Sequence, residues 1–475
     1  MVLIEEEICL KPLMDVADLI RTREISPLEV TQAVLQRIER LNPSLNCFIT
    51  ILEKQSLSDA QSMEDLLQNG TYLGPLHGIP ISLKDSIATA NVLTTAGSPI
   101  LADWVPEVSA TVVERLQAAG SVILGKANLY EFAYGQPHPN YGLTRNPWSF
   151  EHNCGGTSSG SASGVASGLG YGSIGTDAAG SIRIPAAFCG VVGLKPTFGL
   201  VSRAHMIPGS SNLDCAGPLT RTVRDTAAIL QAIAGFDPAD ASTLRHPLPD
   251  FMAHIEDGLK GLRLGVLSHL DSEPIDPEVK TAFQQACSLL EQEGAIISSV
   301  RLPDPIQTRT VLWTIFATET ATYHRPYLRS RAAKDYSPLV RTNLQIGEFI
   351  PATVYVQAQR VRQRMIAEFR DLLANVDAMV MPGVPFPAYP IDPDAQDTLS
   401  LGETKIENLL ELKTRYTAFF NLTGQPAIVL PCGFSSNGLP IALQIVGKPL
   451  DDALVLRIAR AYERITEWHQ RRPRL

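Results

Sequence analysis

Two glycine- and serine-rich segments, Cys154-Gly-Gly-Thr-Ser-Ser-Gly-Ser161 and Gly175-Thr-Asp-Ala-Ala-Gly-Ser-Ile-Arg-Ile-Pro185, decide how this sequence folds. Residues 155–199 contain 12 of the 34 glycines in a chain of 475 residues. Positions 154–193 carry only two charged residues, both in the second segment. Glycines in such loops let backbone N–H groups converge on an anion. The segments therefore predict two loops that present N–H groups, although a loop packed closely against a strand would have a similar composition.

The composition is that of an ordinary globular protein, with 45% hydrophobic and 19% charged residues. A net charge of −9 argues against nucleic acid or an anionic membrane as the main partner. The N-terminus, Met1-Val-Leu-Ile-Glu-Glu-Glu7, lacks the features of a signal peptide, and no apolar run is suited to crossing a membrane. The seven cysteines are scattered, without a CxxC pair. We therefore expect reduced thiols in a cytoplasmic protein rather than a disulfide framework or a zinc site.

Helix and strand signals alternate along the chain, which predicts an α/β fold in one large domain. Ser26-Pro-Leu-Glu29 is a capping box that starts a helix expected to stop at Asn42-Pro43. Residues 304–375 are predicted to be mainly helical, and Met381–Pro390 is predicted to be an irregular, proline-rich loop. Further helices are expected to begin at Ser109 and Asp276, with strands over residues 121–124, 295–300, 426–431 and 441–446, the last two forming a hairpin.

A third segment, Gly74-Pro-Leu-His-Gly-Ile-Pro-Ile-Ser-Leu-Lys-Asp85, contains a candidate base. Its residues 79–83 form a short apolar run that predicts a buried strand, with Lys84 at the end. Most lysines are solvated at the surface, but desolvation favours the neutral amine, which can accept a proton. A serine nucleophile needs such a base, and the glycine- and serine-rich block contains no histidine.

Together, these three segments resemble the amidase signature family. The similarity continues through Ala216-Gly-Pro-Leu-Thr-Arg221 and Gly438-Leu-Pro-Ile-Ala-Leu-Gln-Ile-Val-Gly447, so it covers the chain apart from about residues 300–410. The resemblance implies a single α/β/α layered domain over residues 1–475, built around a large mixed β-sheet. Residues 300–410 would form a variable, mainly helical substrate-pocket region. The implied activity is the hydrolysis of carboxylic amides by a Ser–cis-Ser–Lys triad, with no metal and no organic cofactor.

Matched residue by residue, Ser181 corresponds to the family's nucleophile and Lys84 to its base. The bridging hydroxyl of the family lies 24 positions before the nucleophile, and that position holds Thr157 instead of serine. Threonine still supplies a hydroxyl that donates and accepts, so the relay remains feasible. The neighbouring Ser158 is the alternative bridge if the local register differs.

The resemblance also implies an oxyanion hole formed by backbone N–H groups of the loop before Ser181. Many relatives carry glycine at the position of Ala179, and we expect its methyl group to be tolerated if φ stays negative. Asp177 and Arg183 are interpreted as supports that hold this loop rather than as acid–base residues. The expected donors of the oxyanion hole are the N–H groups of Ala178, Ala179, Gly180 and Ser181.

Three other interpretations remain open. Gly156–Gly160 also matches the G-x-S-x-G pattern of an α/β-hydrolase-type esterase with Ser158 as nucleophile, but no strand signal precedes it. The glutaminase subunit of the tRNA-dependent amidotransferase shares the motifs and passes ammonia to partner subunits. The proline-rich loop and the Thr157 block differ from that subunit, so we expect a free-standing amidase. The third interpretation, motivated by Thr157 alone, is a protein that binds amides without turnover.

The expected partner is a small-molecule amide, with no direct contact to nucleic acid or membrane, and the sequence is compatible with a homodimer. Asn421-Leu-Thr423 fits a glycosylation acceptor pattern, but a cytoplasmic chain would not be modified there. Four aromatic residues suggest a hydrophobic or aryl amide: Trp313, Phe316, Phe386 and Tyr389.

Overall fold

A mixed sheet of 11 strands forms the centre of the computed structural model. The structure describes residues 2–267, 270, 274–302, 304–391, 399–401, 404–406 and 409–475. The strand order is β1-β3-β2-β6-β8-β7-β14-β15-β11-β9-β10, and two small ribbons, β4–β5 and β12–β13, lie outside the sheet. The strands are β1 (Phe48–Ile51), β2 (Pro80–Lys84), β3 (Val122–Ala127), β4 (Arg145–Asn146), β5 (Ser149–Asn153), β6 (Gly172–Asp177), β7 (Val192–Lys195), β8 (Cys215–Thr220), β9 (Arg263–Leu267), β10 (Ile296–Val300), β11 (Ala378–Pro382), β12 (Leu399–Leu401), β13 (Thr404–Ile406), β14 (Ala427–Phe434) and β15 (Pro440–Val446).

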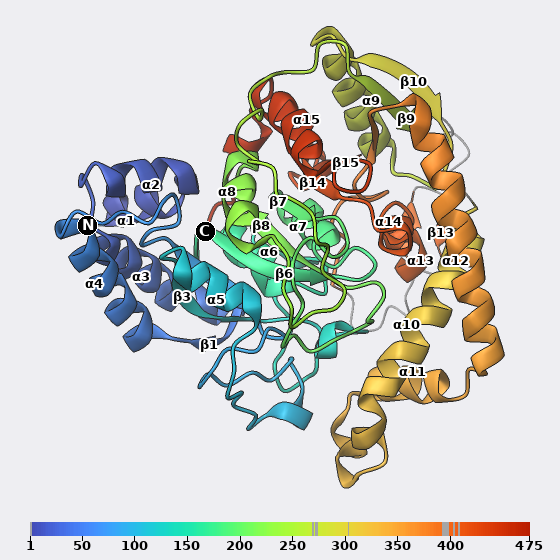
Figure 1. The fold of residues 1–475 in the computed structure, drawn as a ribbon, viewed down its shortest axis with the longest axis horizontal. Helices are drawn as coiled ribbons and strands as arrows, with labels where there is room; N and C mark the ends of the chain where they lie inside the picture. The colour runs from blue at the N-terminus through green and yellow to red at the C-terminus, as the bar shows by residue number, and fades with distance from the viewer. Residues whose placement is uncertain are drawn as a thin grey trace.

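Helices surround this sheet, and those of residues 305–372 lie on the far side of the molecule from the N-terminal helices (Figure 1). Among the helices that pack on the sheet, α6 contacts α7 and α8 contacts α15. The α-helices are α1 (Val2–Cys9), α2 (Leu13–Arg21), α3 (Pro27–Leu45), α4 (Glu53–Gln68), α5 (Thr111–Ala118), α6 (Ser159–Ala166), α7 (Arg183–Cys189), α8 (Val223–Ile233), α9 (Pro277–Gln292), α10 (Pro305–Leu328), α11 (Pro338–Glu348), α12 (Ala352–Leu372), α13 (Leu409–Thr414), α14 (Ala418–Thr423) and α15 (Asp452–Arg464). Short 3₁₀ helices cover Pro99–Leu101, Glu131–Ala133, Arg331–Asp335, Leu373–Asn375 and Trp468–Gln470.

The order and direction of three strands bring the candidate residues to one edge of the sheet. Strand β2 is parallel to its neighbour β6, with Leu83 opposite Ile174, so both strands end at the same edge. Strand β8 is antiparallel to β6 and pairs Cys215 with Asp177, so β8 begins where β6 ends. Lys84, the loop after β6 and the loop before β8 therefore meet at this edge.

The glycine- and serine-rich block forms both loops and one closely packed helix. Helix α6 has the sequence Ser-Gly-Ser-Ala-Ser-Gly-Val-Ala, and every one of its residues is buried. A Cβ atom on Gly160 would overlap the backbone of Cys47 and Asn128. The prediction of two loops was therefore incomplete, because part of the block is a helix whose small side chains permit close contact with neighbouring backbone.

Several predicted elements are confirmed. Ser26 and Glu29 form the predicted capping box, and Asp276 accepts a hydrogen bond from Glu278 N–H at the start of α9. Strands β14 and β15 form the predicted antiparallel hairpin, and residues 305–372 are mainly helical. The large mixed sheet with surrounding helices confirms the predicted α/β class.

Three predicted boundaries were wrong. Helix α3 continues through Pro43 to Leu45, because a proline in the last turn removes only one intrahelical bond and Asn46 closes the helix with a left-handed φ of 55°. Helix α5 begins at Thr111, since the Ser109 hydroxyl accepts a hydrogen bond from Ala90 N–H and does not cap the helix. The proline-rich segment is not wholly irregular, since strand β11 includes Met381 and Pro382 and pairs with β15.

None of the seven cysteines, all of which lie in described residues, forms a disulfide. Within the described ranges, no helix has both the length and the apolar character needed to cross a membrane. The same ranges contain no group of three or more His, Cys, Asp or Glu side chains suited to holding a metal ion.

Candidate active site

Lys84 lies at the end of β2 inside the protein, where its side-chain nitrogen contacts two threonine hydroxyls. Its Nζ atom donates to Thr157 Oγ1 at 2.8 Å and to Thr176 Oγ1 at 2.8 Å. Lys84 is 0% exposed. Burial lowers the pKa of Lys84 to about 7, although the nearby carboxylates of Asp214 and Asp177 favour its charged form. A lysine in this environment can accept a proton near neutral pH.

Thr157 and Ser158, the two candidate bridges, make different contacts. The Gly156–Thr157 peptide bond is cis, and the Thr157 hydroxyl is the one that faces Lys84. The Ser158 hydroxyl donates to Thr176 C=O at 3.2 Å and accepts from Thr176 N–H at 3.3 Å. Ser158 is fully buried and has no histidine partner in the described part of the chain. This geometry suits Thr157 as a bridge and does not suit Ser158 as the nucleophile of an α/β-hydrolase.

Ser181 lies in the loop between β6 and α7, beside the Thr157 segment. The N–H of Ser158 donates to Ser181 C=O at 3.1 Å, which joins the two segments. Ser181 is partly exposed, and its hydroxyl makes no hydrogen bond to any residue that the structure describes. The hydrogen bond between a nucleophile and its proton acceptor is often long in the free enzyme and shortens only when substrate binds. The fold thus brings Lys84, Thr157 and Ser181 into one site, with the Lys84–Thr157 contact already formed.

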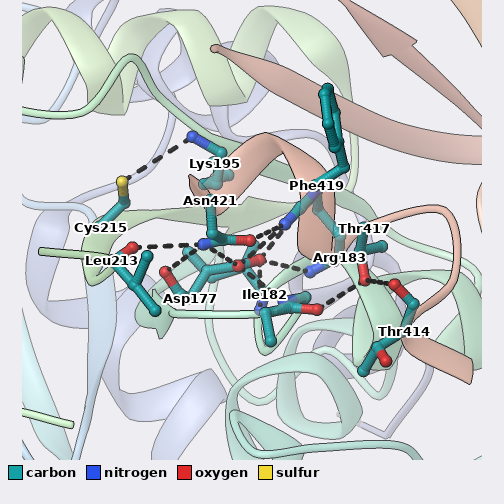
Figure 2. Close-up of polar contacts among 12 residues, drawn as sticks. Asp177, Ile182, Arg183, Lys195, Leu213, Cys215, Thr414, Thr417, Phe419 and Asn421 are labelled. Atoms are coloured by element: carbon teal, nitrogen blue, oxygen red, sulfur yellow. Dashed lines mark hydrogen bonds and ion pairs between the residues drawn. The ribbon is translucent and has the colours of Figure 1, made fainter. Parts of the chain in front are cut away.

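Asp177 and Arg183 hold the ends of the Ser181 loop together (Figure 2). Arg183 donates from Nη2 to Asp177 Oδ1 and from Nε to Asp177 Oδ2, each at 3.0 Å, and both side chains are fully buried. Asp177 also accepts from Ile182 N–H at 3.1 Å. Burial alone would raise the pKa of Asp177, but Arg183, Asn421 and Lys195 hold it well below its usual range. These contacts suit the expected supporting role.

Gly180 was expected to donate to the oxyanion, and the structure contradicts that expectation. Its N–H donates to Asp177 Oδ1 at 2.8 Å and is therefore already used. The N–H groups of Ala178, Ala179 and Ser181 make no hydrogen bond to another described residue. Ala179 has a negative φ, the condition under which we expected its methyl group to be tolerated, whereas Gly180 has φ of 128° and needs to be glycine.

Two supporting residues from the C-terminal part were missed by the sequence analysis. Asn421 donates from Nδ2 to Asp177 Oδ1 at 2.9 Å and accepts from Arg183 Nη2 at 2.6 Å. Gln444 accepts from Arg183 Nη1 at 2.8 Å. In the sequence, Asn421 stands out only as part of a glycosylation acceptor pattern, whereas in the structure it is 1% exposed. Its signal in the sequence was weak, because the partners lie more than 200 positions away.

A cavity of about 240 Å³ lies beside Thr176, the second threonine that contacts Lys84. Asp214 also lines this cavity and accepts from the N–H groups of Gly209 and Ser210 at 2.8 and 2.9 Å. Burial raises the pKa of Asp214 to about 6, although the two N–H groups and Arg203 act to lower it. The carboxylate is thus placed to influence the protonation of Lys84.

The four aromatic residues suggested for the acyl pocket lie in two separate groups. Phe316 and Trp313 pack around Tyr134, with the Phe316 and Tyr134 ring centroids 5.0 Å apart. Phe386 and Tyr389 pack against Phe188 instead. The cavity beside Thr176 is lined by none of the four. The preference for a hydrophobic or aryl amide remains a prediction.

The chain is similar to known proteins both in sequence and in structure. The family model described as Amidase matches residues 29–456. A glutamyl-tRNA(Gln) amidotransferase subunit from Thermosynechococcus vestitus is 38% identical over 95% of this chain and 97% of its own length.

Solved structures match over nearly the whole chain. One, from a vestigial protein complex that reveals the evolutionary origins of an s-triazine catabolic enzyme, has a TM-score of 0.91 and 29% identity, covering 98% of this chain and 100% of that one. The peptide amidase from Stenotrophomonas maltophilia has a TM-score of 0.83 and 33% identity, covering 98% of each chain.

Proposed function

The chain belongs to the amidase family, and from this premise we propose that it hydrolyses a carboxylic amide through an acyl-enzyme on Ser181. Enzymes of this family act on amide C–N bonds, and this chain is an amidase in that sense. The observation that carries the proposal is the 2.8 Å hydrogen bond between buried Lys84 and Thr157, beside the Ser181 loop. The amide itself, the nucleophile and the need for partner subunits belong to the proposal.

The first step is the attack of Ser181 on the amide carbonyl. Neutral Lys84 accepts a proton from the Thr157 hydroxyl, while Thr157 takes the proton of Ser181. The Ser181 oxygen then forms a bond to the carbonyl carbon, and the carbonyl oxygen becomes an oxyanion. The pKa of about 7 supports this role, because a large fraction of Lys84 is neutral near physiological pH.

The oxyanion is stabilised by backbone N–H groups of the loop before Ser181. Ala178, Ala179 and Ser181 supply the candidate donors, since the Gly180 N–H is bound to Asp177. Each donor of this kind contributes about 3 kcal/mol to the stability of the transition state. Support comes from Asp177 and Arg183, which fix the ends of the loop.

Collapse of the tetrahedral intermediate breaks the C–N bond. Protonated Lys84 returns its proton through Thr157 to the leaving amine, which departs and leaves the acyl group on Ser181. Water then attacks the ester and gives a proton to the same relay. The released serine regains that proton, and the products are the acid and the amine or ammonia.

Removing the hydroxyl of Thr157 while keeping its shape tests the bridge. In Thr157→Val, kcat is expected to fall by about 10²- to 10⁴-fold, because Lys84 and Ser181 lose their proton relay. Thr157→Ser restores the hydroxyl and is expected to stay within about tenfold of the original enzyme. Ser158→Ala is the matched comparison, since the Ser158 hydroxyl is bound to the backbone of Thr176. An active Thr157→Val with an inactive Ser158→Ala would make Ser158 the bridge.

Neutralising Asp214 is expected to move the pH profile. The carboxylate favours the charged form of Lys84, so Asp214→Asn lowers the pKa of Lys84 below about 7. The rise of kcat/KM with pH, which follows the loss of the Lys84 proton, then shifts to lower pH. Asp240→Asn is the control, because Asp240 lines the same cavity but pairs with Arg203 at 3.7 Å. An unchanged profile, or a shift to higher pH, would count against Lys84 as the base.

A second candidate is the glutaminase subunit of an amidotransferase. It is favoured by the 38% identity to the amidotransferase subunit from Thermosynechococcus vestitus over almost the entire length of both chains. The proposed chemistry at Lys84, Thr157 and Ser181 would be the same, but the ammonia would pass to a partner. The free-standing amidase is supported by the fit to the peptide amidase over 98% of each chain.

One substrate screen separates these candidates. The chain, expressed alone, is offered short aliphatic, aryl and amino-acid amides, ureido acids and glutamine, with Ser181→Ala in parallel. Hydrolysis of a non-glutamine amide without partners is the expected result. Activity confined to glutamine, and dependent on copurifying subunits and charged tRNA, would instead identify a glutaminase subunit. No activity under either condition would support the protein that binds amides without turnover.

A further inference from the structure

The peptide unit between Ala179 and Gly180 is held at both of its polar ends. Its N–H, on Gly180, donates to Asp177 Oδ1 at 2.8 Å. Its C=O, on Ala179, accepts a hydrogen bond of 2.6 Å from the Thr417 hydroxyl. Because a peptide unit is planar, fixing both ends sets its orientation and the direction from which the chain enters Ser181.

Thr417 reaches this peptide from a distant part of the chain. It lies between α13 and α14, 238 positions from Ala179, and is 0% exposed. Figure 2 shows Thr417 and Asn421 among the residues whose polar contacts surround Asp177 and Ile182. Thr417 also contacts Thr414 C=O, but at 3.2 Å, so the shorter bond is the one to the Ser181 loop.

The backbone of the loop leaves room for this contact only because residue 180 is glycine. Gly180 has φ of 128°, and a Cβ atom there would overlap both Oγ1 and Cβ of Thr417. The N–H groups on either side of the clamped unit, those of Ala179 and Ser181, are candidate oxyanion donors. A rotation of the 179–180 peptide would turn both of them.

We propose that Thr417 is a positioning residue that holds the 179–180 peptide so that the neighbouring N–H groups converge on the oxyanion. The proposal rests on Ser181 being the nucleophile. The Thr417 side chain is fully buried and acts on the loop through its contact with Ala179 C=O. Its hydroxyl is needed for the hydrogen bond, whereas its methyl group only fills space.

The test uses a fluorophosphonate, which labels an activated serine through a phosphoryl oxygen held by the same donors. The second-order rate of labelling of Ser181 is followed by intact mass, together with the melting temperature and the pH dependence of labelling. Thr417→Val removes the hydroxyl and is expected to slow labelling by about 10- to 100-fold. The pH midpoint should not move, because Lys84 keeps its contacts.

Two variants separate positioning from stability. Thr417→Ser retains the hydroxyl and is expected to label within about threefold of the original rate. Thr423→Val removes a hydroxyl bond of the same kind, from Thr423 to Phe419 C=O at 2.8 Å within α14, and is expected to label at the original rate. Equal slowing in Thr423→Val, or no rescue by Thr417→Ser, would assign Thr417 a purely structural role.

The same experiment distinguishes failure of this inference from failure of the proposed function. Ser181→Ala is run in parallel and is expected to take no label. Labelling of Ser181→Ala at the original rate would overturn the proposed nucleophile. An unlabelled Ser181→Ala with full-rate labelling of Thr417→Val would overturn the role of Thr417 and leave the nucleophile intact.

Discussion

Replacing Ser181 by alanine is expected to lower kcat for amide hydrolysis by about 10⁴- to 10⁶-fold, because no acyl-enzyme can form. The change removes one oxygen atom from a partly exposed loop residue whose hydroxyl makes no hydrogen bond to a described residue. The melting temperature should therefore stay close to that of the original chain. Steady-state kinetics on the best amide of the screen measure the effect.

Ser158→Ala is the comparison for this first prediction. Both serines are in the glycine- and serine-rich block, but the Ser158 hydroxyl contacts the Thr176 backbone. We expect Ser158→Ala to retain measurable turnover. Loss of activity in Ser158→Ala together with retained activity in Ser181→Ala would favour the α/β-hydrolase interpretation.

Replacing Lys84 by methionine is expected to reduce kcat by about 10⁴- to 10⁶-fold, since the relay loses its proton acceptor. Methionine fills most of the space of the lysine stem and carries no charge. The fold should tolerate the change, because an apolar side chain suits this fully buried position. Circular dichroism and the melting temperature verify that the chain is folded. The residual activity should also lose its pH dependence near 7.

Lys84→Ala provides a second check, because it leaves space for a small amine. Adding methylamine is expected to restore part of the activity, and the restoration should increase with pH as the free amine becomes more abundant. Turnover in Lys84→Met near the original level, with an unchanged pH profile, would exclude Lys84 as the base.

The sequence was sufficient to predict the α/β class of the fold and to locate the segments that form the site. The apolar run of residues 79–83 predicted β2 as a buried strand. Lys84, at the end of that strand, was therefore expected to lie in an apolar environment. Capping signals at Ser26 and Asp276 act within one turn of the helix, so they could be recognised from local sequence alone.

Contacts between distant segments could not be predicted in this way. Thr417 and Asn421 act on residues more than 200 positions away, and nothing in their local sequence indicates the partner. Gly180 is a different case, since its partner Asp177 is only three positions away, but the sequence does not show that the Asp177 carboxylate turns toward the Gly180 N–H. The glycine content of the first segment had two causes, the loop and the close packing of α6, and composition does not separate them.

The most direct test of the central claim is to trap the acyl-enzyme. The enzyme is mixed with excess of its best amide, quenched in acid within one turnover, and analysed by intact mass and peptide mapping. The account predicts a mass increase equal to the acyl group on the peptide that contains Ser181, and no increase in Ser181→Ala. An adduct on Ser158 would contradict it. Rapid turnover with no covalent adduct would also contradict it, provided that the substrate is one for which deacylation is slower than acylation.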